Sequence, residues 1–161
     1  MIKKKYLNHI LIISIIFLVD RLSKIYIINL AEDLSNFSIT MTTFLNIILV
    51  WNSGIGFGLL SFEKQFLYNL ITLIIILVNL VILYLGIKSS NFKGFLFFII
   101  LGGSLGNLFD RLYYSAVPDF IDINYNGFHW FIFNVADIFI SIGIICLIFA
   151  ELLNYKKKNE N

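Results

Sequence analysis

Four long apolar runs restrict what this sequence can fold into. A helix needs about 20 apolar residues to cross the hydrocarbon layer of a membrane, and each run is close to that length. Hydrophobic residues make up 59% of the 161-residue chain and charged residues only 14%, so the apolar surface exceeds what a soluble domain of this size buries. The sequence therefore predicts an α-helical integral membrane protein with four transmembrane helices, at residues 7–30, 66–87, 95–112 and 131–153.

The positions of the basic residues predict the orientation of these helices. Eight of the twelve lysines and arginines flank the runs in alternate segments: Lys3, Lys4, Lys5, Lys88, Lys93, Lys156, Lys157 and Lys158. Lysine and arginine collect in cytoplasmic loops, so both termini and the turn at 88–94 are expected in the cytoplasm. Residues 31–65 and 113–130 would then face the outside.

The first of these outer segments has a composition that favours strands. Threonine, isoleucine, phenylalanine and valine dominate between Asn36 and Leu60, and three glycines cluster at the end of that stretch. Short strands fit this pattern better than a fifth crossing does. We expect a small extracytoplasmic β-cradle at about 36–64, able to hold an extended peptide on the outer leaflet, within a single membrane domain that covers residues 1–161.

Two aspartates, Asp119 and Asp137, are the candidate catalytic residues, because each stands at the edge of an apolar segment, where a carboxylate is costly. Two carboxylates at short range share one proton, since both cannot ionise. The ionised member can take a proton from water as the water attacks a peptide carbonyl, while the protonated member polarises that carbonyl. Suitable donors for fixing the scissile backbone are Asn52, Asn107, Arg111 and Asn134.

Polar residues of three predicted helices are expected to meet at one depth. At ~1.5 Å per residue, Asp20 lies ~20 Å from the cytoplasmic start of the first helix, and Asn107 and Arg111 lie ~18 to 24 Å along the third. Asp137 lies ~6 to 9 Å below the outer end of the fourth helix, which is ~21 to 24 Å from the inner surface of a ~30 Å layer. This shared depth predicts one site near the outer surface.

Two helix faces carry the polar groups that would surround this site. Asp20 and Lys24 are four residues apart on the first helix, where they can pair, and an ionisable group there costs about 3 kcal/mol without a partner. A salt bridge that orients the helix is favoured over direct catalysis. On the third helix one face gathers Gly103, Asn107, Asp110 and Arg111, which indicates a site rather than packing alone.

Other chemistries fit the sequence less well. The stretch 102–106 matches G-x-S-x-G, but no strand-to-helix elbow is predicted there, and His9 is expected on the cytoplasmic side. The sequence has no His-Glu-x-x-His motif, and its one cysteine is Cys146, so neither a metal nor a cofactor is expected. The alternative to an enzyme is a four-helix membrane scaffold, or an ion or proton pathway, that uses the same aspartates.

Four ordered blocks resemble the lipoprotein signal peptidases, the bacterial signal peptidase II family. They are DRLSK at 20–24, NSGIGFG at 52–58, GGSLGNLFDR at 102–111, and VPDFI at 117–121 together with FNVAD at 133–137. The set spans nearly the whole chain and is highly specific as a set. The chain departs from the family pattern at Arg21, Gly56, Pro118 and Phe131, of which Pro118 fixes the backbone and removes a donor beside Asp119.

The resemblance implies an aspartic endopeptidase with Asp119 and Asp137 as its catalytic pair. Its activity would remove signal peptides from prolipoproteins by cleavage on the N-terminal side of a diacylglyceryl-modified cysteine. The fold implied is four membrane helices with an outer β-cradle and a short surface helix. The positions expected to line or support the site are Asn52, Gly54, Asn107, Arg111, Asn134, Ala136, Asp20 and Lys24, beside Asp110 from the helix face.

The expected location is the bacterial cytoplasmic (inner) membrane, with both termini in the cytoplasm and the active site near the extracytoplasmic face. The expected partners are diacylglyceryl-prolipoprotein substrates and membrane lipids, without nucleic acid. We expect a monomer.

Overall fold

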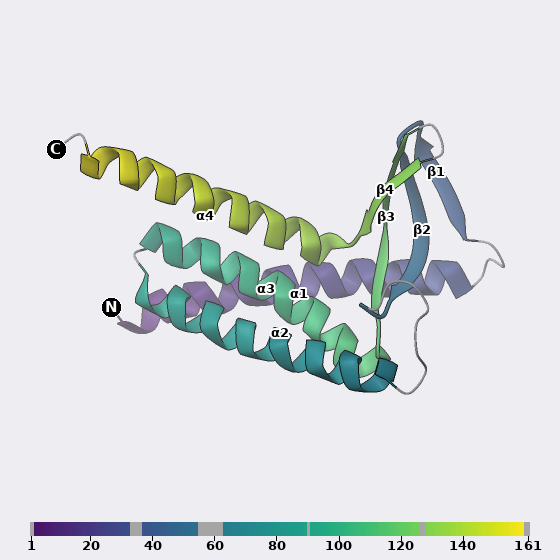
Figure 1. Cartoon of the computed structure of the whole chain (residues 1–161), viewed down its shortest axis with the longest axis horizontal. Helices are drawn as coiled ribbons and strands as arrows, with labels where there is room; N and C mark the ends of the chain where they lie inside the picture. Colours follow the sequence, from purple (N-terminus) through teal and green to yellow (C-terminus); the bar gives the residue numbers. More distant parts are fainter. Residues whose placement is uncertain (1, 33–36, 55–62, 90, 126–127, 160–161) are drawn as a thin grey trace.

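The computed structural model describes residues 2–32, 37–54, 63–89, 91–125 and 128–159. Four helices lie side by side along the long axis, and a four-stranded sheet stands across one end of them (Figure 1). The helices are α1 (Ile2–Glu32), α2 (Glu63–Lys88), α3 (Asn91–Tyr114) and α4 (Val135–Asn159). The strands are β1 (Ser38–Thr42), β2 (Leu45–Asn52), β3 (Val117–Tyr125) and β4 (Phe128–Phe133).

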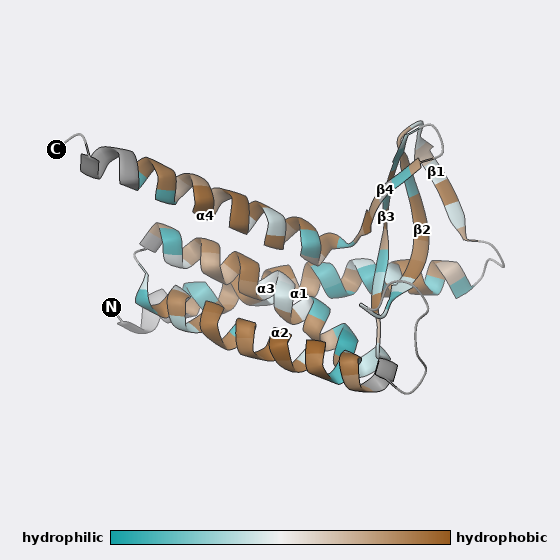
Figure 2. Cartoon of the chain, in the orientation of Figure 1, coloured by the Kyte–Doolittle hydropathy of each residue, from teal (hydrophilic) through white to brown (hydrophobic). Residues whose placement is uncertain are grey.

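Three of the described helices are long and apolar enough to cross a membrane. Their apolar segments are Phe66–Lys88, Phe92–Tyr114 and Val135–Asn154. Hydrophobic residues predominate along the coloured parts of α2 and α4 (Figure 2). The crossing by α1 stays a prediction, because the polar residues Asp20 and Lys24 interrupt its apolar run.

Helix α3 packs at the centre of the bundle, in contact with each of the other helices. Glycines let its neighbours come close to its backbone. A Cβ atom added to Gly103 would stand 2.6 Å from the carbonyl oxygen of Ala136 in α4, and one added to Gly106 would collide with the carboxylate of Asp20 in α1. These two contacts bring the polar residues of α1, α3 and α4 to one place.

The sheet is antiparallel, with the strand order β1-β2-β3-β4. Its first two strands lie in the segment 36–64 where strands were predicted. The rest of that segment includes residues 55–62, which lie outside the described residues. The short surface helix implied by the resemblance therefore stays a prediction. Strand β3 comes from the segment 113–130 and joins the two halves of the chain in one sheet.

The predicted start of the fourth helix at residue 131 is wrong. Phe131 belongs to strand β4, and helix α4 begins at Val135. The apolar run 128–133 is rich in aromatic and β-branched residues, which fit a strand at least as well as a helix. Asn134 then separates the two elements, because asparagine is a strong helix N-cap.

Pro118 is accommodated where β3 has one neighbouring strand. It lies opposite Trp51 of β2, whereas the pairing of β3 with β4 begins only at Ile121. A proline lacks the N–H that a strand with neighbours on both sides would use, so this is a position where a strand tolerates it.

Candidate active site

Asp119 lies on β3 and is held by two asparagine side chains. Its side chain is almost fully enclosed, with 4% of the residue exposed. The Nδ2 atom of Asn52 donates to its Oδ2 atom at 2.9 Å, and the Nδ2 atom of Asn134 donates to its Oδ1 atom at 2.6 Å. Asn52 reaches Asp119 diagonally, because the register pairs Asp119 with Val50, two residues earlier on β2.

Asp137 lies in the first turn of α4, where it forms a reciprocal cap with Asn134. The Oδ1 atom of Asn134 accepts the backbone N–H of Asp137 at 3.2 Å, and the Oδ2 atom of Asp137 accepts the backbone N–H of Asn134 at 3.1 Å. This is the geometry of a capping box, which fixes the start of the helix. The Oδ1 atom of Asp137 accepts a second hydrogen bond to the carboxylate, from Nδ2 of Asn107 at 2.8 Å.

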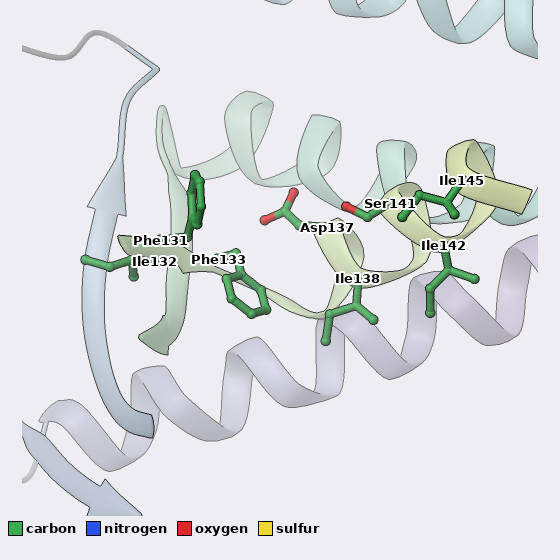
Figure 3. A pocket seen from close by; sticks show the side chains of 8 residues that line it. All are labelled: Phe131, Ile132, Phe133, Asp137, Ile138, Ser141, Ile142 and Ile145. Carbon is green, nitrogen blue, oxygen red and sulfur yellow. The ribbon is translucent and has the colours of Figure 1, made fainter. Parts of the chain in front are cut away.

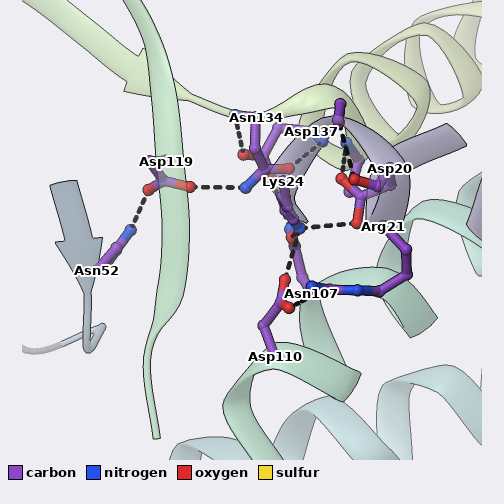
Figure 4. Close-up of polar contacts among 11 residues, drawn as sticks. Asp20, Arg21, Lys24, Asn52, Asn107, Asp110, Asp119, Asn134 and Asp137 are labelled. Atoms are coloured by element: carbon purple, nitrogen blue, oxygen red, sulfur yellow. Dashed lines mark hydrogen bonds and ion pairs between the residues drawn. The ribbon is translucent and has the colours of Figure 1, made fainter. Parts of the chain in front are cut away.

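Asn134 therefore connects the two aspartates. Its side-chain amide donates to Asp119, its backbone amide donates to Asp137, and the residue is completely buried (Figure 4). The pair that the sequence singled out comes together around this one asparagine.

Burial raises the pKa of Asp119 above its ordinary value. The hydrogen bonds from Asn52 and Asn134 act in the opposite direction, and the nearby charge of Asp137 adds to the increase. Desolvation disfavours a charged carboxylate, and a like charge disfavours it further. The proton of the pair is therefore held more readily by Asp119 than by an ordinary aspartic acid.

A buried cluster of charges lies next to the aspartates, between α1 and α3. The ammonium group of Lys24 donates to Oδ2 of Asp20 and to Oδ2 of Asp110, both at 2.7 Å, so the pairing predicted four residues apart on α1 is present. Arg21 forms an ion pair with Asp110 and lies over the ring of Phe109, 4.9 Å from its centroid. The arginine that departs from the family pattern thus has its own partners.

Asp20 also caps the beginning of α4. Its Oδ1 atom accepts the backbone N–H of Ala136 at 2.9 Å, and Ala136 is completely buried. The first N–H groups of a helix have no partner within the helix, so a carboxylate from α1 fills that need here. Asp20 thereby fixes the turn that carries Asp137.

Gly54 and Arg111 lie together at the end of β2. Gly54 has a φ of 73°, and its N–H donates to Oδ1 of Asn52 at 2.8 Å. A side chain would be strained at this φ. A Cβ atom on Gly54 would be 3.6 Å from Nη2 of Arg111, and the backbone carbonyl of Arg111 accepts the hydroxyl of Tyr68 at 2.6 Å. No feature of the sequence singled out Tyr68, which lies in a uniform apolar run.

A second buried aspartate of strand β3 was not identified from the sequence. Asp122 lies on β3 with a completely buried side chain, and it accepts hydrogen bonds from Nδ2 of Asn46 at 3.1 Å and from Nδ2 of Asn124 at 3.4 Å. The Nδ1 atom of His129 is 2.8 Å from its Oδ1 atom. Alternation of Phe120, Asp122 and Asn124 would have indicated one face of a strand, had β3 been recognised. Ser104, the centre of the rejected serine motif, lies within α3.

An apolar groove runs from Asp137 along α4. Its volume is about 420 Å³, and Asp137 is the one charged residue among those that line it (Figure 3). The lining residues come from β4 and α4: Phe131, Ile132, Phe133, Asp137, Ile138, Ser141, Ile142 and Ile145. An apolar chain that lies in this groove would pass beside the aspartate.

Comparisons with known proteins agree on one family. The family model described as signal peptidase (SPase) II matches residues 12–153. A lipoprotein signal peptidase of Pelagibacter ubique (strain HTCC1062) is 49% identical over 160 residues, 99% of this chain and 96% of that protein. A lipoprotein signal peptidase of Anaplasma phagocytophilum (strain HZ) is 34% identical, over 97% and 99%. A bacterial membrane enzyme solved by the in meso method at 2.3 Å has a TM-score of 0.76 and 33% identity, with 96% of this chain and 93% of that chain covered.

The fold and the site define a membrane-embedded enzyme in which a small antiparallel sheet and the helix ends hold two aspartates. The family match covers most of the chain, and the relatives match it over nearly their full length. The chain belongs to the signal peptidase II family. It is therefore a peptidase, and the family assignment favours the enzyme over the scaffold or the ion pathway.

Proposed function

We propose that this protein acts as a lipoprotein signal peptidase. It removes signal peptides from prolipoproteins by cleavage on the N-terminal side of a diacylglyceryl-modified cysteine. The names of its relatives support this activity. The observation that carries the proposal is the placement of Asp119 and Asp137 around Asn134, with hydrogen-bond donors on both carboxyl groups.

In the proposed mechanism, Asp119 is the acid and Asp137 is the base. Burial raises the pKa of Asp119, so Asp119 is assigned the shared proton and the charged carboxylate is assigned to Asp137. It takes a proton from a water molecule whose oxygen bonds to the peptide carbonyl carbon, while Asp119 gives its proton to the carbonyl oxygen. The C–N bond then breaks, the leaving nitrogen takes the proton from Asp137, and one hydroxyl of the intermediate returns a proton to Asp119.

Asn52 and Arg111 lie where they can bind the substrate backbone. Asn52 is exposed and already holds Asp119. The guanidinium group of Arg111 lies beside Gly54, two residues after Asn52. Donors placed around the scissile carbonyl would stabilise the negative charge that develops on its oxygen.

The groove along α4 supports entry of the substrate from the bilayer. It has apolar walls and reaches Asp137, so the acyl chains of the substrate can stay in lipid while the cysteine backbone reaches the aspartates. In this proposal all four helices cross the bacterial cytoplasmic (inner) membrane as one domain, the protein is a monomer, and the sheet with the site lies on the extracytoplasmic side.

The activity is tested with a purified lipidated precursor and the intact protein. Replacement of Asp119 or Asp137 by Asn should lower the rate of cleavage by about 100- to 10,000-fold, the usual contribution of a general acid or base. The matched control is Asp122→Asn, which alters a buried aspartate on the same strand that is bound to neither catalytic residue. Cleavage by folded Asp119→Asn and Asp137→Asn at the rate of the control would refute the proposed function.

A further inference from the structure

Lys24 uses all of its hydrogen-bonding capacity inside the protein. Its side chain is completely buried, and an ammonium group has three donors. Two of them bind Asp20 and Asp110, and the third binds the Oδ1 atom of Asn107 at 2.8 Å. Among the hydrogen bonds of the described residues, none joins Lys24 to Asp119 or Asp137. The group therefore reaches the site only through its neighbours.

Asn107 transmits the position of Lys24 to a catalytic aspartate. Its carbonyl oxygen accepts from Lys24, and its amide nitrogen donates to Oδ1 of Asp137 at 2.8 Å (Figure 4). A flipped amide would place its NH₂ against the ammonium group and its carbonyl oxygen against a carboxylate. Both contacts would be repulsive, so Lys24 allows one orientation of this amide.

The ammonium group itself cannot turn away from Asn107. Asp20 comes from the same helix, and Asp110 comes from the facing helix α3, so two carboxylates hold Lys24 from different elements. Each of these carboxylates has a further partner, which is the N–H of Ala136 for Asp20 and Arg21 for Asp110. The orientation of Asn107 is thus set by a charge-balanced cluster of two cations and two anions.

We propose that Lys24 is a positioning residue of the reaction, which orients the amide of Asn107 so that Asp137 receives a hydrogen bond and serves as the proton acceptor. The inference rests on the proposed function, because it concerns the base of that reaction. Its consequence is that Lys24 controls the chemical step and leaves substrate binding unchanged. A purely structural salt bridge would instead affect the amount of folded protein.

A kinetic double-mutant cycle between Lys24 and Asn107 tests this inference. Lys24→Met should lower kcat for a lipidated precursor by about 10- to 100-fold, the size expected from one hydrogen bond to a charged group, with KM little changed. Asn107→Ala should lower kcat by a similar factor. The double variant should be no slower than Asn107→Ala, because the amide that Lys24 orients is absent.

Three further variants keep the result interpretable. Lys93→Met is the matched control, because Lys93 pairs with Glu151 at the end of the bundle away from the sheet. Removal of Lys24 leaves buried carboxylates without a counter-charge and can prevent folding. In that case Lys24→Met is combined with Asp110→Asn, which restores the charge balance, and is compared with Asp110→Asn alone.

The outcomes separate this inference from the proposed function. The inference is overturned if Lys24→Met keeps full kcat per folded molecule. It is also overturned if Lys24→Met combined with Asp110→Asn has the same kcat as Asp110→Asn alone. A third contrary result is a double variant of Lys24 and Asn107 in which the two losses of kcat multiply. Asp119→Asn is measured in the same assay. If that variant is inactive while loss of Lys24 has no effect, only the inference fails; if that variant is fully active, the proposed function fails.

Discussion

Asp119 accepts hydrogen bonds from two side-chain amides, and the contribution of each to the pKa of Asp119 can be measured separately. Asn52 and Asn134 both donate to its carboxyl group, one from a neighbouring strand and one from the start of α4. Both hydrogen bonds lower the pKa of Asp119, against burial, which raises it. The protonation of the proposed acid is therefore a balance between residues that can be removed one at a time.

Loss of Asn52 should move the pH dependence of cleavage. Asn52→Ala removes a hydrogen bond that favours the charged form, so the pKa of Asp119 should rise further. Because Asp119 must carry a proton, the rate falls as the pH rises through its pKa. The alkaline limb of the kcat profile should therefore shift to higher pH.

Asn46→Ala is the control for this profile, since Asn46 also lies on β2 but donates to Asp122. Its alkaline limb should coincide with that of the unmodified protein. An alkaline limb that stays in place or moves to lower pH in Asn52→Ala would contradict the role of Asp119 as the acid.

At the scale of elements, the junction between β4 and α4 determines the geometry of the site. The strand ends at Phe133, the helix begins at Val135, and Asn134 between them touches both aspartates. One residue thus both caps the helix and donates hydrogen bonds to the two carboxyl groups. These two roles can be separated by substitution.

Asn134→Ser should keep the cap and lose the activity. Serine is as good an N-cap as asparagine, whereas Asn134→Ala should cost about 1 kcal/mol of stability. Neither variant has an amide that donates to Asp119, so both should cleave a lipidated precursor far more slowly. Thermal unfolding in detergent and the cleavage rate are measured for both; full activity in the serine variant would show that the cap alone matters.

The elements differ in how far the sequence could predict them. Helix α2 follows from a uniform apolar run of membrane-spanning length, and α3 follows from an apolar run that carries polar residues near its end. Strand β4 was merged with the last helix because aromatic residues such as Phe131 are equally apolar in either state. The asparagine three residues before Asp137 is a capping signal that locates the true start of α4.

The contacts within the site depended on more than local pattern. The pairing of Asp20 with Lys24 follows from helix periodicity, since the two are four residues apart. The contact between Lys24 and Asn107 joins residues 83 positions apart. It depends on how closely α1 packs against Gly106 of α3, and a single sequence gives no direct information on that packing.

At the scale of the whole molecule, the chain runs to the sheet twice and returns twice. Helices α1 and α3 lead towards the sheet and α2 and α4 lead away from it, so both chain ends lie at the opposite end (Figure 1). With 31 residues, α1 is about 46 Å long, enough to span the bilayer despite its polar cluster. This arrangement agrees with the proposed topology, in which the lysine-rich ends stay in the cytoplasm.

The orientation of the molecule in the membrane can be tested with single cysteines. In a Cys146→Ser background, a cysteine is introduced either as Ser38→Cys on β1 or as Asn154→Cys near the end of α4, both at exposed positions. A membrane-impermeant thiol reagent applied to intact spheroplasts should label the first variant and should label the second only after the membrane is opened. The reverse pattern in active protein would place the sheet in the cytoplasm. The aspartates beside that sheet would then be on the opposite side from exported prolipoproteins, so this result would also count against the proposed route of the substrate.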